Sequence, residues 1–266
     1  MKIIFLNSYS PRTGHNFVAQ VLKIVSDAEI IPHNQAETRL SLFLESYHKL
    51  QQQHFIKGSV KDFLDSIFVK NARERILKDY TASYLLIKDT NHQGVSFQKK
   101  SFPDDIHFLM FRDPRDTLIS IFKGMRFYNE KGFKAALKKI GFWSGLYSYY
   151  YSWNYSRHFI KTIPGDLEGF FVIRYEDLVK RDKETLKRLI QIFNSNMGVE
   201  GFITRINEIS VINTSFHKEE TGGKHIWDSQ NATSKFNPVN RKNIPFLHRK
   251  GIELGSKKFR KKLGYI

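Results

Sequence analysis

The chain has 266 residues, of which 41% are hydrophobic, so it is long enough to bury a sizeable core. Lys and Arg number 43 against 26 Asp and Glu, and the resulting charge of +17 favours anionic partners: nucleic acid, an acidic membrane surface, or phosphorylated and sulfated small molecules. No cysteine is present, which excludes disulfides and cysteine-ligated metals.

The hydropathy pattern contains no targeting or membrane segment. Only four apolar residues follow Met1-Lys2, too few for the core of a signal peptide. No apolar run approaches the roughly 18 residues that a membrane-spanning helix needs. We therefore expect a cytoplasmic protein without a transmembrane segment.

The first stretch predicts a strand, a turn and a helix. The apolar run 3–6 suits a strand buried on both faces. A polar turn containing Pro11 and Gly14 follows, and apolar residues then recur at helical spacing from Phe17. Such units cradle phosphates, because N–H groups at the helix start point at the anion, and Arg12 would add a full charge. An ordinary strand–turn–helix of an α/β domain fits equally well, and the Gly-Lys-Ser/Thr pattern of ATP-type P-loops is absent.

Helices and strands alternate along the next part of the chain. A second strand or a loop is expected within 24–34, then helices over about 40–50 and from Ser59 to about Ile76, where Ser59 and Asp62 form a capping-box pattern. A substrate lid could be built in this helical excursion, at about 35–80. Further buried strands are predicted at 84–87, 106–111 and 170–173, with aromatic-rich helices over 133–163 and a long helix ending near 194. This alternation predicts an α/β fold with a central parallel sheet flanked by helices.

The last part of the chain reads as a long polar loop at about 213–245, followed by a basic helix over 250–262. No internal repeat and no linker divides the sequence. We therefore expect a single domain over 1–266.

Charged and polar side chains follow three of the predicted strands. Arg12 follows the first strand, Lys88 and His92 follow the strand at 84–87, and Arg112 follows the strand at 106–111. Ligands of parallel sheets bind beyond the carboxyl ends of the strands. The sequence therefore predicts an anion-binding site at this edge of the sheet.

Two of these segments resemble motifs of the sulfotransferase family. Phe-Arg-Asp-Pro-Arg-Asp-Thr-Leu-Ile-Ser, at 111–120, is similar to the family's 3′-phosphate-binding motif, and Ser-Pro-Arg-Thr-Gly-His-Asn-Phe, at 10–17, resembles its 5′-phosphosulfate loop. Arg-Tyr-Glu-Asp-Leu at 174–178 matches a further, mainly structural family segment. Order and spacing agree over residues 3 to about 180. The resemblance implies a three-layer α/β sandwich of the P-loop NTPase-like type.

The resemblance also implies a donor and the residues that bind it. The donor would be 3′-phosphoadenosine 5′-phosphosulfate (PAPS), and the product adenosine 3′,5′-bisphosphate (PAP). Arg112 and Ser120 would hold the 3′-phosphate. The 5′ end would be bound by the loop residues Arg12, Thr13, Gly14, His15, Asn16 and Phe17, in which His15 and Asn16 replace the family's usual Thr pair.

The family has a C-terminal Arg-Lys-Gly stretch that contacts the 3′-phosphate. Arg241-Lys242 is its best counterpart in position, because it lies inside the long loop. Arg249-Lys250-Gly251 matches by letters and is the alternative.

The loop Lys-Asp-Thr-Asn-His, at 88–92, occupies the place where many relatives carry Lys-Thr-His with a catalytic His. Lys88 would assist the reaction, and His92 is the favoured general base, because the reference pKa of His is about 6.5 and that of Asp about 3.9. Asp89 is the alternative base, since some relatives use a carboxylate. The resemblance implies no metal.

The sequence therefore predicts a sulfotransferase that moves a sulfuryl group from PAPS to an acceptor hydroxyl or amine. Two other classes fit parts of the pattern: a kinase-like phosphoryl-transfer enzyme, although its Gly-Lys-Ser/Thr cradle is missing, and a basic nucleic-acid-binding protein, although Lys and Arg are spread along the chain. We expect a small-molecule, lipid or glycan acceptor and no specific nucleic acid. The sequence names neither the acceptor nor the oligomeric state.

Overall fold

The computed structural model describes residues 1–33, 37–53, 56–124, 132–209, 211–212, 219–220, 224–225, 232–233 and 244–266. They form two compact units. The first unit comprises Met1–Phe111 and Thr162–Asn207, and the second comprises Arg112–Lys161 and Glu208–Ile266. We describe each unit by itself, and the single domain over 1–266 stays a prediction.

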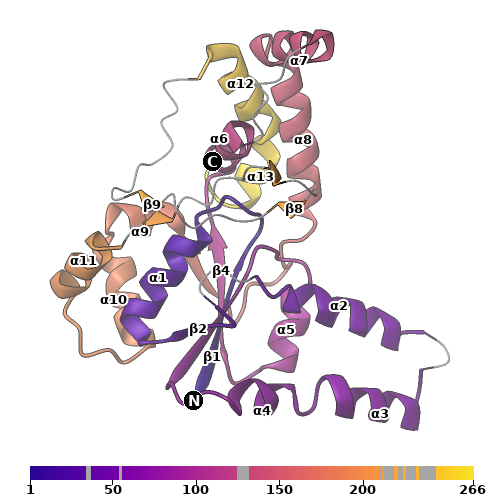
Figure 1. The fold of residues 1–266 in the computed structure, drawn as a ribbon, viewed down its shortest axis with the longest axis vertical. Helices are drawn as coiled ribbons and strands as arrows, with labels where there is room; N and C mark the ends of the chain where they lie inside the picture. Colours follow the sequence, from indigo (N-terminus) through magenta and orange to yellow (C-terminus); the bar gives the residue numbers. More distant parts are fainter. Residues whose placement is uncertain are drawn as a thin grey trace. The chain divides into compact units, whose positions relative to one another are not determined.

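The first unit contains a five-stranded parallel sheet with the strand order β2-β3-β1-β4-β5 (Figure 1). Its strands are β1 (Lys2–Ser8), β2 (Glu29–Ile31), β3 (Tyr84–Asp89), β4 (Ile106–Phe111) and β5 (Phe171–Arg174). All predicted strands are present, and the segment at 24–34 provides β2. The parallel sheet confirms the predicted α/β fold.

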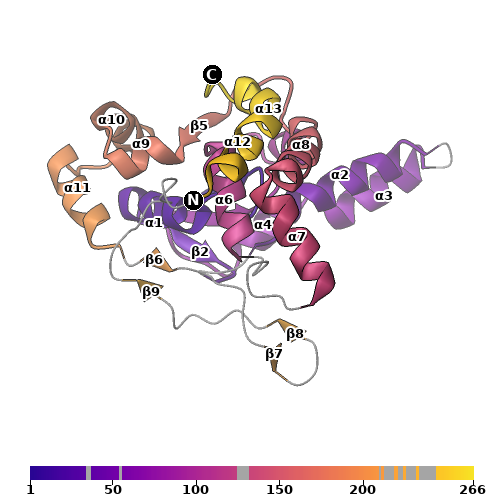
Figure 2. The same cartoon turned by 90° about the horizontal axis from the view of Figure 1, so that it is seen from above.

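Helices cover both faces of this sheet. They are α1 (His15–Ser26), α2 (Leu40–Gln51), α3 (Ser59–Phe68), α4 (Ala72–Leu77), α5 (Val95–Ser101), α9 (Tyr175–Lys180), α10 (Lys183–Ile192) and α11 (Val199–Asn207). Figures 1 and 2 show α1 with α9, α10 and α11 on one side and α2 to α5 on the other. The helices flanking the sheet are therefore as predicted.

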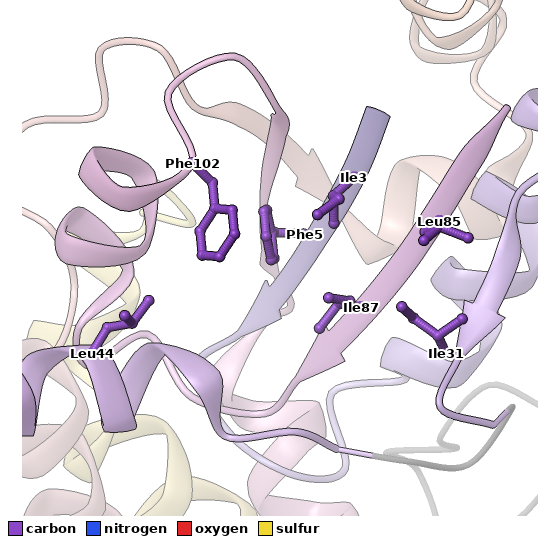
Figure 3. Packing of buried hydrophobic residues seen from close by; sticks show 7 residues of the cluster. All are labelled: Ile3, Phe5, Ile31, Leu44, Leu85, Ile87 and Phe102. Carbon is purple, nitrogen blue, oxygen red and sulfur yellow. The ribbon is translucent and has the colours of Figure 1, made fainter. Parts of the chain in front are cut away.

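The core explains why the strand sequences are almost continuously apolar. Successive side chains of a strand point to opposite faces, so a strand covered on both faces buries every residue. On one face, Ile3 and Phe5 of β1 pack in a cluster that also contains Ile87 of β3, Leu44 of α2 and Phe102 (Figure 3). Burial of large side chains like these, at about 1.5–3 kcal/mol each, supplies much of the stability of the sheet.

A buried carboxylate joins the start of β1 to two neighbouring segments. The side chain of Asp105 accepts a hydrogen bond from the Ile3 backbone N–H at 2.8 Å. It also accepts hydrogen bonds from Nε and Nη2 of Arg73, at 2.8 and 3.0 Å. Charge-assisted, forked bonds of this kind hold α4 and the segment before β4 against the first strand.

Three helix predictions were wrong in detail. The capping box at Ser59 does not form, because Gly58 is the N-cap residue of α3 and no side chain caps the helix. The helix expected to reach Ile76 is divided into α3 and α4. The long helix expected after β5 is divided where Arg181 adopts a left-handed conformation (φ 57°) and Asp182 caps α10 by accepting the Thr185 N–H at 2.9 Å.

The second unit is mainly helical. It contains α6 (Pro114–Gly124), α7 (Phe133–Trp143), α8 (Leu146–Ile160), α12 (Phe246–Gly255) and α13 (Lys257–Lys262), with the short strands β6 (Val211–Ile212), β7 (Glu219–Glu220), β8 (Lys224–His225) and β9 (Ala232–Thr233). The helix expected over 250–262 is thus two helices, and most of the predicted loop at 213–245 lies outside the described residues. Within the described ranges, no helix is long and apolar enough to cross a bilayer.

Two glycines allow α12 to pack closely on α8. A Cβ atom at Gly251 would lie 2.3 Å from the backbone oxygen of Gly145, and one at Gly255 would lie 2.5 Å from that of Tyr149. Larger residues would therefore push the helices apart. A hydrogen bond between the buried side chains of Ser148 and His248 also joins them. Gly251 of the Arg-Lys-Gly stretch thus has a packing role.

Candidate active site

The loop after β1 makes a strained turn that opens α1. Arg12 and Gly14 both have left-handed backbones, with φ values of 69° and 87°. A Cβ atom at Gly14 would lie 2.3 Å from Cε2 of Tyr175, so only glycine fits there. The buried hydroxyl of Thr13 stabilises the turn by donating to the Ser10 carbonyl at 3.0 Å. The first N–H groups of a helix have no intrahelical acceptor, so those at this turn can donate hydrogen bonds to a bound anion.

A buried lysine from the neighbouring strand reaches this turn. Lys88 of β3 donates from Nζ to the side-chain oxygen of Asn16 at 2.7 Å. Its side chain is fully buried, and burial lowers the pKa of Lys88 to about 8, although the charge of Glu37 acts in the opposite direction. The ammonium group is therefore still mostly protonated at pH 7. Lys88 therefore places a positive charge beside the turn that opens α1.

Asp89, the last residue of β3, is a buried carboxylate with a raised pKa. Its Oδ2 accepts a hydrogen bond from the Ser41 hydroxyl at 3.1 Å, and its Oδ1 has no hydrogen-bond partner among the described residues. Burial is the main cause that raises the pKa of Asp89 to about 6, and the charge of Glu37 raises it further. A carboxylate with this pKa is basic enough to accept a proton near neutral pH.

Glu37 lies next to this site and was not identified from the sequence. It precedes α2, and its Oε2 accepts a hydrogen bond from the Thr90 hydroxyl at 2.6 Å. The next residue, Thr38, donates its backbone N–H to the Lys88 carbonyl at 3.2 Å, which fixes this segment beside the end of β3. Glu37 carries no motif, and only its place in the fold reveals it.

His15, the first residue of α1, lies beside the Glu37 carboxylate. Its Nε2 is 3.4 Å from Oε1 of Glu37. Burial, with the charge of Lys88, lowers the pKa of His15 to about 3. The ring is therefore neutral at pH 7, and its contact with Glu37 is not an ion pair.

His92 lies in a more enclosed place than the sequence suggested. It is buried, its Nε2 lies 3.1 Å from the Asn7 backbone oxygen, and its ring packs edge-on against those of Tyr9 and Phe111. Burial lowers the pKa of His92 to about 4, against the opposite effect of the Asn7 hydrogen bond. Asp89 is therefore the stronger base of the two, the reverse of their reference order.

Phe17 has a packing position. It is buried in α1 and packs edge-on against the Tyr175 ring, with centroids 5.9 Å apart. The guanidinium of Arg181 lies 5.7 Å from the centre of the Phe17 ring. Phe17 thereby holds α1 against the start of α9.

The second unit contains the Arg-Asp-Pro-Arg-Asp segment that directly follows β4. Pro114 begins α6, and the buried Asp113 precedes it, accepting hydrogen bonds from the Arg115 backbone N–H at 2.9 Å and from the Arg115 side chain. Arg260 of α13 lies 3.8 Å from the same carboxylate. Arg112 is buried beside this capping residue, and Ser120 is half-buried on α6. Asp113 therefore caps the helix that opens directly after the strand end and Arg112.

A cavity of about 290 Å³ adjoins this segment inside the second unit. Its lining consists of Arg115, Ile119, Arg249, Lys250, Ile252 and Glu253. Three of the six side chains are basic, and Lys250 donates to Glu253 at 2.9 Å. The alternative Arg249-Lys250 pair therefore lies at a cavity with Arg115 of the motif, whereas Arg241 and Lys242 lie outside the described residues.

The structure thus brings together, within the first unit, the predicted residues of the loop after β1 and of the loop after β3. Lys88 contacts Asn16 directly, and its charge helps to lower the pKa of His15. The charge of Glu37 acts to raise the pKa of both Lys88 and Asp89. The predicted Arg112 and Ser120 belong to the second unit. Within the described residues, no three His, Asp or Glu side chains gather in a way that could hold a metal ion.

Comparisons with solved structures return matches at low identity. Mouse sulfotransferase SULT7A1 complexed with PAP is 17% identical, covers 99% of this chain and 88% of its own, and has a TM-score of 0.43. Retinol dehydratase in complex with androsterone and the inactive cofactor PAP is 15% identical over 100% of this chain and 81% of its own, with a TM-score of 0.43. The sulfotransferase domain of the olefin synthase from Synechococcus PCC 7002 is 13% identical over 100% and 95%, also with a TM-score of 0.43.

The family comparison is decisive. A search of curated protein sequences finds no match to the chain. The model of the sulfotransferase family matches residues 10–197, well over half of the sequence. The matched span includes the loop that opens α1, Lys88 and Asp89, and the whole segment from Arg112 to Ser120. This chain belongs to the sulfotransferase family.

Proposed function

We propose that this sulfotransferase takes its sulfuryl group from PAPS and transfers it to a hydroxyl or amine. The observation that carries the proposal is the fully buried Lys88, bonded to Asn16 at the turn that opens α1. A positive charge beside the N–H groups that open a helix favours an anion bound there. The 5′-phosphosulfate end of the donor is such an anion.

The donor's two ends have separate binding groups in this proposal. Arg12, Lys88 and the N–H groups of residues 13–16 bind the 5′ end. Arg112 and Ser120 bind the 3′-phosphate, which carries close to two charges at neutral pH. The cavity lined by Arg115, Arg249 and Lys250 supports a role for the latter two near the 3′-phosphate, beside the earlier suggestion of Arg241 and Lys242.

Transfer proceeds as an in-line displacement at sulfur. The acceptor oxygen or nitrogen forms its bond to sulfur while the bond from sulfur to the 5′-phosphate oxygen breaks. Negative charge then grows on the leaving phosphate, and Arg12 and Lys88 stabilise it there. The acceptor proton passes to a general base.

Asp89 is the general base in this proposal. Its raised pKa of about 6 and its unbonded Oδ1 support this assignment. His92 stays the base predicted from sequence, but its enclosed ring and its pKa of about 4 weigh against it. We propose that His92 instead supports the loop through Asn7.

The reaction is tested by incubating the protein with isotopically labelled PAPS and a metabolite extract. A labelled, sulfated product identified by mass would establish the reaction and name the acceptor class. A Lys88→Met variant, which keeps the length of the side chain but not its charge, serves as the control and should give little product. Release of the sulfuryl label as inorganic sulfate without any sulfated product, or no transfer to any compound, would contradict the proposal.

Lys88 should make donor binding depend on pH. A bound anion raises the pKa of a nearby ammonium. PAP binding should therefore be accompanied by proton uptake around pH 8, the pKa of Lys88 in the protein without ligand. Affinity should therefore fall as pH rises above about 8. Calorimetric titration in two buffers of different ionisation enthalpy measures the uptake, which should vanish in Lys88→Met. Unchanged proton uptake in that variant would show that another group titrates.

A further inference from the structure

The second unit presents a group of large apolar side chains to solvent. They lie on α7 and at the starts of α8 and α12, near the upper end of Figure 1. We call this group the apolar tip. Each of its residues is between 53% and 78% exposed, and they are Phe133, Leu137, Ile140, Trp143, Leu146 and Phe246. An exposed apolar cluster of this kind marks an interaction surface.

Apolar side chains lie on two opposite sides of α7, one exposed and one buried. Phe133, Leu137 and Ile140 follow one another at intervals of four and three residues, which places them within an arc of about 60° on the helix. The opposite side carries the buried Phe142, whose ring lies 5.3 Å from that of Phe122 and 5.2 Å from that of His248. One side of α7 thus holds the helix to its unit while the other points an apolar stripe outward.

Among the described residues, the charged side chains of α7 and α8 are all basic. The stretch 132–160, which includes α7 and α8, contains no Asp or Glu. Lys138 and Lys139 follow Leu137 directly, and the guanidinium of Arg249 lies 5.8 Å from the centre of the Phe246 ring. The only acid of α12, Glu253, is bonded to Lys250. The tip is therefore an apolar surface within a basic surround.

We propose that the apolar tip docks this enzyme on a lipid bilayer that contains anionic lipids. An interfacial helix buries apolar and Trp side chains at the level of the headgroups, while Lys and Arg meet the lipid charges. A second copy of the chain is a poorer partner, because it would bring the same basic surround and a charge of +17 against its own. Docking by this surface does not depend on the identity of the donor or of the acceptor.

Vesicle co-sedimentation tests the docking. The whole chain should bind vesicles of phosphatidylcholine with about 30 mol% phosphatidylserine at least about tenfold more strongly than vesicles of phosphatidylcholine alone. The double variant Leu137→Glu, Ile140→Glu should lose at least about tenfold of this binding. Phe63→Glu is the matched control, because Phe63 is also a 64% exposed apolar residue but lies on α3 of the other unit. It should bind as the unchanged chain does.

Two further measurements distinguish docking on lipid from misfolding of the double variant and from dimerisation. Trp143 should be quenched by brominated lipid, and Trp143→Phe should remove that quenching. The thermal shift given by PAP should be the same in the double variant and in the unchanged chain, which shows that the variant is folded. The proposal is overturned if anionic vesicles do not bind the chain, if Phe63→Glu loses as much binding as the double variant, or if sedimentation reveals a dimer that the double variant abolishes without any vesicle binding.

Discussion

Asp89→Asn should lower the turnover of sulfuryl transfer by about 10²- to 10⁴-fold, the usual contribution of a general base. The amide keeps the shape of the carboxylate and can still accept the Ser41 hydrogen bond, but it cannot take the acceptor proton. PAP affinity and the melting temperature should change little. The measurement is steady-state turnover with PAPS at saturating acceptor, beside calorimetric titration with PAP.

The pH profile gives this prediction a second readout. Catalysis needs the ionised form of Asp89, so the rate should fall as pH drops below about 6, the pKa of that carboxyl group. The charge of Glu37 contributes to raising this pKa, so Glu37→Gln should shift the acid limb to lower pH. His92→Ala should lose less turnover than Asp89→Asn. If His92→Ala is the inactive variant, the sequence-based choice of base is correct, and if Glu37→Gln is inactive, Glu37 is the base.

Arg12→Gly should slow sulfuryl transfer by about 10²- to 10³-fold, because it removes a preorganised donor to the charge that grows on the leaving phosphate. The affinity for PAP should fall by a smaller factor, since charge on the bridging oxygen develops fully only during the reaction. Arg12→Lys keeps the charge but not the forked geometry of the guanidinium. Its turnover should therefore lie between that of the unchanged protein and that of Arg12→Gly. Equal losses in turnover and in PAP affinity would contradict this role.

Stability should respond to Arg12→Gly in the opposite direction. Arg12 holds a left-handed backbone at φ 69°, which glycine adopts without strain. Relief of that strain is worth roughly 1–2 kcal/mol, against a conformational-entropy cost of up to about 1 kcal/mol in the unfolded chain. The free energy of unfolding should therefore hold steady or rise while turnover falls. Urea denaturation measures it, and a marked loss of stability would show that Arg12 is a structural residue.

The sheet could be predicted because its signal is local. A strand covered on both faces buries every side chain, so the run 3–6 and the runs at 84–87 and 106–111 stand out as short apolar segments. The helix boundaries were less predictable. Gly58 replaces the expected capping box of α3, and the left-handed Arg181 ends α9 although its neighbours favour a continuous helix.

The family could also be predicted from its motifs, but the relative basicity of the candidate bases could not. The segments at 10–17 and 111–120 are continuous runs of sequence, so they can be recognised without knowledge of the fold. The relative basicity of Asp89 and His92 depends on burial, which raises the pKa of the carboxyl group to about 6 and lowers that of the imidazole to about 4. Reference values give the reverse order. Glu37 reaches the site only because Thr38 is bonded to the end of β3.

The measurement that tests the central claim most directly is a comparison of two nucleotides by calorimetric titration. The account assigns the 3′-phosphate to Arg112 and Ser120, and a charge-assisted hydrogen bond is worth about 1.5–3 kcal/mol. Adenosine 3′,5′-bisphosphate should therefore bind roughly ten- to a hundredfold more tightly than adenosine 5′-monophosphate, and Arg112→Ala should remove most of the difference. Equal affinities for the two nucleotides in the unchanged protein would contradict the account.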